Sequence, residues 1–438
     1  MGAPTSDGIR VGEGTTFVIG AVLAGGIRTV VAVILVFVIM VMIHEFGHFI
    51  VAKRAGVLVY RFAIGFGPRL FSFSRGETEY SIRLFPLGGY VMLAGEMPQD
   101  TYFKIGEQIA VRLDQIQQVD LIGDPSDVQN ATVVGHLRAI DTMRSFTVTL
   151  ETEDGVYSYA FSKHSFLATG KEPIAIAPPD RQMNQKPIWV RMAIALAGPF
   201  MNVVLATVLF AVILGVMGSF SSPPQFASIE SGSPAAHAGL KSGDVLVAVN
   251  HQPVHNWMTF VTEIQSHPKQ PLDITVDRGS VDKSLVITPE KRSDGTGFIG
   301  VTPVIDHSLW SAMTNSVYQT GQYSQMITNA FVGMFSHGNT FVKDTAGPVK
   351  IVQVIGQQAQ LGILQLLNLT AILSLNLAIL NLLPIPPLDG SRILLLIVEF
   401  LRGRPIDPRK EYWVHAIGFV LIITLMVVRT YLDVAQMF

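Results

Sequence analysis

"VMIHEFGHFI", residues 41–50, places a glutamate and two histidines inside an apolar run. No charged residue occurs in residues 29–43, and the apolar pattern resumes at residues 49–52. A membrane-spanning helix needs about 20 predominantly apolar residues, so residues 29–52 are long enough to cross a bilayer. An ionisable side chain inside such a span is costly and indicates a function. The alternative is a helix end at the membrane surface, where polar residues cost little.

The spacing of the three polar residues predicts a zinc site. His44 and His48 are four residues apart, about 40° around a helix and one turn apart, so that both imidazoles face one way. Glu45 lies about 100° from His44, close enough to touch a zinc-bound water without binding the metal. In this His-Glu-x-x-His pattern the histidines are ligands and the glutamate is a general base.

The composition indicates a membrane protein. Of the 438 residues, 49% are hydrophobic and 15% are charged, whereas a soluble chain carries about 25% charged residues. The net charge of −2 excludes a general attraction to nucleic acid. The chain has no cysteine, so any metal must be held by histidine and carboxylate ligands.

Four apolar segments are predicted to span the membrane as helices. They are residues 29–52, 190–218, 361–390 and 412–432. The last of them is long enough only if Arg429 extends its charge to the interface. Residues 1–28 form a leader of open role, without the basic start and cleavage site of a signal peptide.

Basic residues near the ends of the spans predict the orientation, because cytoplasmic loops are rich in Lys and Arg. Such residues follow the first span and precede the second, and they recur between the third and fourth spans: Lys53, Arg54, Arg61, Arg69, Arg181, Lys186, Arg191, Arg392, Arg402, Arg404, Arg409 and Lys410. We therefore expect these two loops in the cytoplasm. Both termini and the region between the second and third spans are expected outside it.

Three further regions are predicted between the spans. Residues 53–96 contain a strand–turn–strand pattern with apolar flanks around residues 75–77, which predicts a hairpin that enters the membrane; a peripheral hairpin is the alternative. Residues 97–189, with a hairpin turn at residues 154–155, predict a small β-rich cytoplasmic insert. Residues 304–350 predict an amphipathic helical linker at the membrane surface.

Residues 225–303 are predicted to fold as a separate domain. The order of expected elements and the residues GSPA, AGL, SGD and VN closely resemble a bacterial PDZ domain. PDZ domains bind extended chain ends by strand addition. We expect this domain outside the cytoplasm, where it acts as a size filter or binds a newly trimmed end. A β-rich spacer without a ligand is the alternative.

A catalytic zinc needs a third protein ligand and an open position for water. The candidate is Asp389, at the end of NLAILNLLPIPPLDG and the first charged residue after Lys350. The prolines at positions 384, 386 and 387 cannot continue a helix. They leave an extended end that can turn the carboxylate toward the histidines. The alternative is a polar residue that only caps a helix boundary.

The HEFGH of the first span, with N-x-x-P-x-P-x-L-D-G near the third, resembles the site-2 protease family of intramembrane zinc metalloproteases. LAGPFMN in the second span and the PDZ-like region after it also match. FAIGFGPRLFSF, LFPLGGYVMLAGE and DRQMNQKPIWVRM are similar to the RseP/RasP type, in its single-PDZ branch known from Gram-positive bacteria.

The resemblance implies a polytopic α-helical membrane protein with four transmembrane helices, a re-entrant β-loop, a cytoplasmic β-rich insert and one extracytoplasmic PDZ domain. It implies one Zn2+ per chain, held by His44, His48 and Asp389, with Glu45 as the catalytic base. It also implies substrate contacts, which are assigned to Asn381, Asn202, Gly88 and Gly89.

We expect an endopeptidase of the bacterial plasma membrane that cleaves single-span membrane proteins within the bilayer, after a first cleavage by another protease. The resemblance implies anti-sigma factors and remnant signal peptides as substrates, and no nucleic acid as a partner. The main alternative is a non-proteolytic PDZ-bearing adaptor with a structural zinc, which would have no need for Glu45. A zinc transporter would need polar faces on several spans.

Overall fold

The computed structural model describes residues 12–96, 103–168, 173–336, 347–404, 406 and 408–435. The chain forms two compact units, one of Met1–Leu205 with Met326–Phe438 and one of Ala206–Gln325. Within the described residues, four helices are long and apolar enough to cross a membrane: Gly26–Arg54, Ile188–Met217, Ile363–Asn381 and Trp413–Asp433. These helices overlap the four predicted spans.

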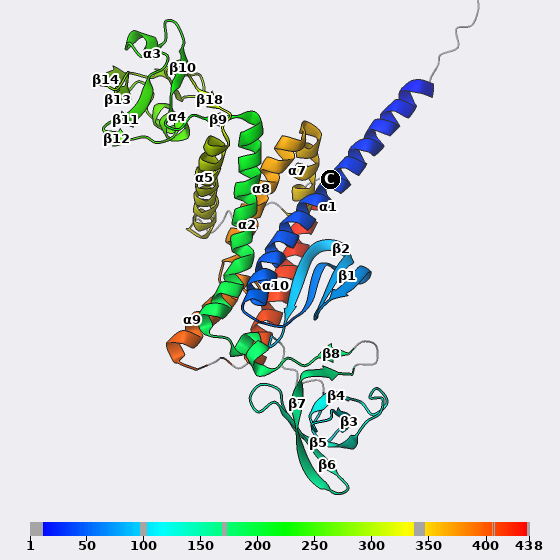
Figure 1. Cartoon of the computed structure of the whole chain (residues 1–438). Coiled ribbons are helices and arrows are strands. Elements are labelled where there is room, and N and C mark those ends of the chain that lie inside the picture. Colours follow the sequence, from blue (N-terminus) through cyan, green and yellow to red (C-terminus); the bar gives the residue numbers. More distant parts are fainter. Residues whose placement is uncertain are drawn as a thin grey trace, which may run out of the picture. The chain divides into compact units, whose positions relative to one another are not determined.

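The first span is part of a single long helix, α1 (Gly12–Arg54) (Figure 1). The helix begins well before the predicted boundary at residue 29, so residues 12–28 of the predicted leader continue the span as helix. Residues 1–11 lie outside the described part of the chain. Lys53 and Arg54 occupy the last turn, where the partial negative charge of a helix C-terminus favours cations.

The other spans are α2 (Ile188–Met217), α8 (Ile363–Asn381) and α10 (Pro408–Ala435). An additional helix, α7 (Pro348–Leu361), precedes α8 and packs on α1. Ala32, Val36 and Met40 of α1 are four residues apart and form a buried cluster with Ile355 of α7. This stripe holds α1 against its neighbours, because residues four apart share one helix face.

The connection between the third and fourth spans contains a helix that the sequence analysis did not predict, α9 (Asp389–Arg402). Leu396 and Glu399 are buried on one face of α9, whereas Leu394 and Ile397 are exposed on the other. The charged residues of α9, which are Asp389, Arg392, Glu399 and Arg402, recur at helical spacing along one face, so the sequence does carry the pattern of an amphipathic helix.

The predicted linker contains α5 (Leu309–Ser336), a helix of 28 residues without a charged side chain. Its side chains contact α2, where the Thr207 and Thr320 hydroxyls lie 3.0 Å apart and Phe210 stacks on Tyr323. Small buried residues at four-residue spacing, Ala312, Ser316 and Thr320, form the inner face. Such spacing permits close helix approach in membranes. The sequence analysis did not predict this contact with the second span.

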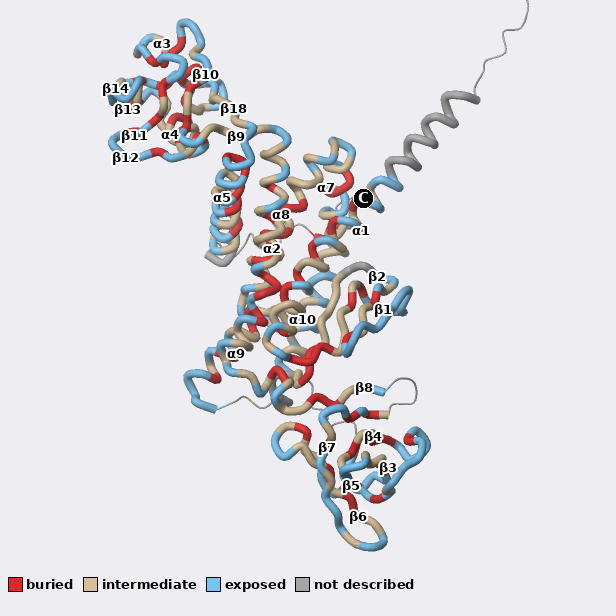
Figure 2. Tube along the Cα trace, viewed as in Figure 1, coloured by how far each residue is buried: buried red, intermediate tan, exposed pale blue. Residues whose placement is uncertain are grey.

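The hairpin predicted beside the first span consists of β1 (Val59–Arg75) and β2 (Thr78–Leu93), which pair antiparallel and contact α1. Several register shifts interrupt the pairing, as bulges do where a strand must bend. Much of the hairpin is coloured as exposed in Figure 2. Its exposed large apolar residues are Phe66, Leu70, Phe71, Phe73, Ile82, Leu84 and Phe85. This surface favours the prediction of a hairpin that enters the membrane over that of a peripheral one.

Residues 108–175 form a six-stranded sheet of order β4-β3-β5-β6-β7-β8. The strands are β3 (Gln108–Leu113), β4 (Val119–Gly123), β5 (Val133–Asp141), β6 (Thr147–Thr152), β7 (Gly155–Leu167) and β8 (Ile174–Ala175). The insert is therefore β-rich, as predicted. Thr152 pairs with Gly155, so the turn lies at residues 153–154, one residue before the predicted position. Two short 3-10 helices, η2 (Pro179–Arg181) and η3 (Met183–Gln185), lead into α2.

In the second unit, a four-stranded sheet of order β12-β11-β13-β14 packs around Phe226, Trp257 and Phe260. Its elements are β9 (Ser219–Phe220), β10 (Phe226–Ile229), α3 (Pro234–His237), β11 (Val245–Val249), β12 (Gln252–Pro253), α4 (Trp257–Ser266), β13 (Leu272–Asp277), β14 (Asp282–Ile287), β15 (Glu290–Lys291), β16 (Gly297–Phe298), β17 (Val301–Pro303) and β18 (Ile305–Asp306). The order of strand, turn, strand, helix and hairpin is the one expected for residues 225–303.

Candidate active site

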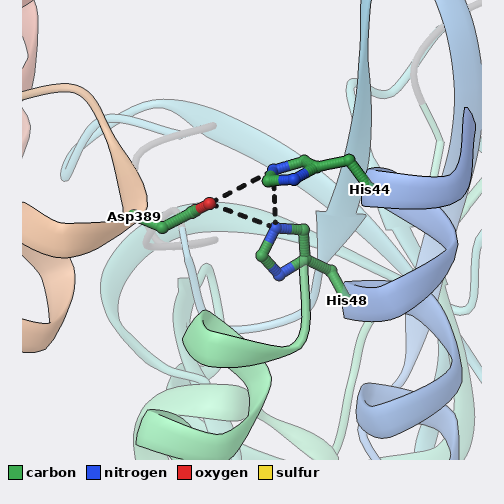
Figure 3. A group of neighbouring side chains, drawn as sticks. All are labelled: His44, His48 and Asp389. Carbon is green, nitrogen blue, oxygen red and sulfur yellow. Dashed lines mark hydrogen bonds and ion pairs between the residues drawn. The ribbon is translucent and has the colours of Figure 1, made fainter. Parts of the chain in front are cut away.

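Three candidate metal ligands meet where α9 approaches α1. His44 and His48 project from adjacent turns of α1 toward Asp389, the first residue of α9 (Figure 3). The two histidine Nε2 atoms are 3.3 Å apart. Asp389 Oδ2 lies 3.2 Å from His44 Nε2 and 3.5 Å from His48 Nε2. The carboxylate also benefits from the partial positive charge at the N-terminus of α9.

The triangle formed by these three atoms has the size of one face of a zinc tetrahedron. Metal–ligand bonds of about 2.0–2.2 Å at tetrahedral angles place neighbouring ligand atoms about 3.3–3.6 Å apart, and the three observed separations are 3.2, 3.3 and 3.5 Å. Asp389 Oδ2 is buried and makes no well-formed hydrogen bond within the described residues. The residues therefore fit a zinc ion with three protein ligands. A fourth position would remain for water, as in catalytic rather than structural zinc sites.

Helix α2 approaches the histidines so closely that only glycine fits at position 198. A Cβ atom at Gly198 would overlap His48 Nε2 and lie 2.7 Å from His44 Cε1. A Cβ atom at Gly47 of α1 would likewise overlap the backbone carbonyl of Ala197. These two glycines allow α1 and α2 to pack backbone to backbone beside the site.

The orientation of His48 is fixed from α2. His48 Nδ1 lies 2.7 Å from the backbone carbonyl oxygen of Ile194. A carbonyl oxygen can only accept a hydrogen bond, so Nδ1 carries the proton and Nε2 presents its lone pair to the other ligands. This is the arrangement typical of metal-binding histidines, whose second ring nitrogen donates to a backbone or carboxylate oxygen.

The chain between α8 and α9 is the proline-rich turn that the sequence predicted, and it brings Asp389 to the histidines. A Cβ atom at Gly390 would overlap the carbonyl oxygens of Leu382 and Leu383. A Cβ atom at Gly418 of α10 would overlap the carbonyl oxygen of Pro386. Close backbone contacts on both sides therefore hold the turn that carries Asp389.

A cavity of about 280 Å³ adjoins the three ligands and is also lined by Glu45, Gly89 and Arg392. A Cβ atom at Gly89 would lie 3.0 Å from Glu45 Cγ, so strand β2 passes Glu45 with no side chain between them. Gly88 is placed differently, because a Cβ atom there would overlap the ring of Phe66. Of the two glycines predicted to contact substrate, Gly89 lines the cavity.

The two asparagines predicted to contact substrate lie on opposite nitrogens of His44. Asn381 Nδ2 is 3.3 Å from His44 Nε2, beside the ligand triangle. Asn202 Nδ2 is 3.2 Å from His44 Nδ1, on the far side of the ring, and Asn202 is fully buried. A substrate in the cavity would have to displace His44 to reach Asn202. Asn202 therefore lies behind His44 and is not among the residues that line the cavity, and its assignment to substrate binding stays a prediction.

Two ion pairs of α9 were not predicted. Arg191 Nη1 of α2 lies 2.7 Å from Glu399 Oε1, with both side chains largely buried, and Arg392 Nη1 lies 2.5 Å from Glu96 Oε1 at the cavity. Arg392 and Glu399 are seven residues apart, on one face of α9. This seven-residue spacing was the available sequence signal for the two ion pairs. It indicates a shared face only once residues 389–402 are recognised as a helix.

Glu399→Gln is expected to destabilise the protein, because it leaves the Arg191 guanidinium buried without its counter-ion. Removing one partner of a buried pair costs about 3–5 kcal/mol. The exposed pair Arg138–Glu151 provides a matched control, since Glu151→Gln should cost less than about 1 kcal/mol. Thermal unfolding in detergent measures both. Equal melting temperatures for the two variants would contradict a supporting role for the α9 ion pair.

The model of peptidase family M50 matches residues 32–425. The chain belongs to peptidase family M50. Among its M50 relatives, the zinc metalloprotease RasP of Geobacillus kaustophilus is 35% identical over 418 residues, which cover 94% of this chain and 99% of the relative. The regulator of sigma-W protease RasP of Bacillus subtilis is 34% identical over 421 residues, with 94% and 99% covered.

The PDZ domain of an SdrC-like protein from Listeria monocytogenes is 22% identical and covers 20% of this M50 chain and 92% of its own, with a TM-score of 0.18. This score is too low to assign a fold, so the PDZ assignment of residues 225–303 stays a prediction from the sequence.

Membership of M50 confirms the predicted site-2 protease resemblance. The chain is an intramembrane zinc metalloendopeptidase of a bacterial membrane, and zinc is its cofactor. The adaptor alternative is not favoured. The four apolar helices agree with this function.

Proposed function

We propose that this M50 peptidase hydrolyses a peptide bond of a single-span membrane protein in the cavity beside His44, with Glu45 as the base. The observation that carries the proposal is that the candidate ligand triangle and Glu45 line one and the same cavity. His44, His48 and Asp389 hold the zinc, which when bound supplies Lewis-acid activation of water and of the scissile carbonyl.

Glu45 and Asn381 supply the remaining chemistry. The Glu45 carboxylate takes the proton from the attacking water and passes it to the leaving amine, as a general base and then a general acid. The Asn381 amide lies beside His44 Nε2, where an N–H group can donate a hydrogen bond to the substrate oxygen on which negative charge develops. Donors fixed in such a position stabilise the transition state.

Strand β2 presents the substrate. Peptide bonds in an intact helix are shielded, so the substrate must unwind, and its freed backbone groups need partners inside the membrane. Pairing with a strand provides them. Gly89 beside Glu45 lets a substrate backbone approach the base without a side chain in the way, and Gly88 precedes it in the same strand.

The topology and the substrate class complete the proposal. The basic residues support a topology with the loops between the first and second and between the third and fourth spans in the cytoplasm, and with both termini and the PDZ-like domain outside. The name of the Bacillus subtilis relative, a regulator of sigma-W protease, supports anti-sigma factors as substrates, with remnant signal peptides as a second class. Substrates first trimmed by another protease would pass a PDZ domain acting as a size filter.

Asp389→Ala is expected to lose tightly bound zinc, because two imidazoles alone give an incomplete site. Metal analysis of detergent-purified protein measures the loss, and cleavage of a model single-span substrate should fall with it. Asp154→Ala is a control at an exposed carboxylate in the turn between β6 and β7 that is not in the candidate ligand group, and it should keep its zinc. Full zinc occupancy in Asp389→Ala would remove Asp389 from the site.

A further inference from the structure

Asn202 contacts the nitrogen of His44 that faces away from the ligand triangle. Its side chain is fully buried in α2 and approaches His44 Nδ1 at 3.2 Å. On the opposite side of the ring, His44 Nε2 faces His48 and Asp389 at 3.3 and 3.2 Å. Only Nε2 points at the ligand triangle, so only Nε2 can bind zinc there.

Zinc binding through Nε2 requires the proton of the neutral imidazole to be on Nδ1. The group facing Nδ1 must then accept a hydrogen bond. In the orientation drawn, the amide nitrogen of Asn202 faces Nδ1, and Asn202 Oδ1 is buried without a partner among the described residues. The two ends of an amide are interchangeable in shape and are assigned from their hydrogen-bond partners. Rotation of the amide by half a turn places Oδ1 on the Nδ1 proton.

We propose that Asn202 is a positioning residue that accepts the Nδ1 proton of His44 and so holds this imidazole in the tautomer that presents Nε2 to zinc. The inference rests on the proposed zinc site. Asn202 then accepts the Nδ1 proton of His44 in the same way as the Ile194 carbonyl accepts that of His48. Both orienting groups come from α2, so this helix sets both histidines although it contributes no ligand.

The backbone of Asn202 is itself held in place. The Ser374 hydroxyl of α8 donates a 2.9 Å hydrogen bond to the Asn202 carbonyl oxygen, and both residues are fully buried. This contact helps to keep the side-chain amide of Asn202 beside His44. A hydrogen-bond acceptor on the second nitrogen of a ligand histidine orients the ring and raises the basicity of the ligand nitrogen. The loss of such an acceptor typically weakens metal binding about 10–100-fold.

Zinc affinity in three variants tests the proposal, measured on the full-length protein in detergent by competition with a chelator. Asn202→Ala removes the acceptor and should weaken zinc binding about 10–100-fold. Asn202→Asp keeps the shape of the side chain, and its ionised carboxylate can only accept a hydrogen bond. This variant should therefore bind zinc at least as tightly as the wild type. Ser374→Ala loosens the backbone of Asn202 but keeps the acceptor for His44, so it should weaken zinc binding far less than Asn202→Ala.

Each result decides between this role and another. Weak binding in both Asn202→Ala and Asn202→Asp would show that the amide donates to Nδ1, and would overturn the proposal. Wild-type zinc affinity in Asn202→Ala, with a raised KM, would return Asn202 to substrate binding. If Asn202→Ala fails to fold, Asn202→Leu against Asn202→Asp gives the same comparison, with circular dichroism of the metal-free proteins as the folding control. Loss of zinc in Asp389→Ala separates a failure of this inference from a failure of the zinc site itself.

Discussion

Glu45→Gln is expected to abolish cleavage of a single-span substrate while zinc stays fully bound. Glutamine keeps the size of the side chain but cannot take a proton from water, and loss of a general base typically costs about 10²–10⁴-fold in rate. Glu45 lines the cavity but is not one of the three atoms of the ligand triangle, so the metal should be unaffected. Cleavage of a model substrate by purified protein and zinc analysis of the same samples measure the two quantities.

A second carboxylate in the same cavity provides the control. Glu96 also lines the cavity but is engaged in an ion pair with Arg392, so Glu96→Gln should reduce the rate far less than Glu45→Gln. Equal cleavage by the wild type and Glu45→Gln would remove Glu45 from the mechanism. Equal losses in the two glutamine variants would mean that any change of charge in the cavity inactivates the enzyme, and Glu45 would have no special role.

The ligands could be predicted because their signals are local. Two histidines one helical turn apart follow from spacing within a few residues. Asp389 was a candidate from its place after a proline-broken span, and the family resemblance favoured it over a helix cap. The spans follow from apolar length alone, since a bilayer sets that length. The beginning of α1 at Gly12 was missed, because residues 15–27 are too short and too glycine-rich to indicate a span by themselves.

The parts that support the ligands depend on contacts between distant residues and carry no local signal. Asn202 could be singled out from the sequence, but its place behind His44 depends on how α1 and α2 pack. Glu399 pairs with a residue that precedes it by 208 positions. By contrast α9, which begins at the candidate ligand Asp389, has charged residues at helical spacing, and this local signal was available in the sequence.

Gly198 is the clearest case of such a contact, and a single methyl group there is expected to remove the zinc without changing any ligand. The Cβ atom in Gly198→Ala would overlap His48 Nε2 and press on His44. If the α2 backbone withdraws, the hydrogen bond between Ile194 and His48 and the close packing of Gly47 on Ala197 are lost. If it stays, the imidazoles must move, which breaks the 3.3 Å spacing of their Nε2 atoms. Either response disturbs the ligand triangle.

We therefore expect zinc content and cleavage to fall together in Gly198→Ala, to the level of Asp389→Ala. Gly215→Ala is the matched control, because it lies in the same helix and its added Cβ would meet nothing within 4 Å. Alanine favours a helix over glycine by about 1 kcal/mol, so the control should be as stable as the wild type or more so. Normal zinc content in Gly198→Ala would mean that α2 stands further from the histidines than the structure has it. The orienting contacts of Ile194 and Asn202 would then have to be reconsidered as well.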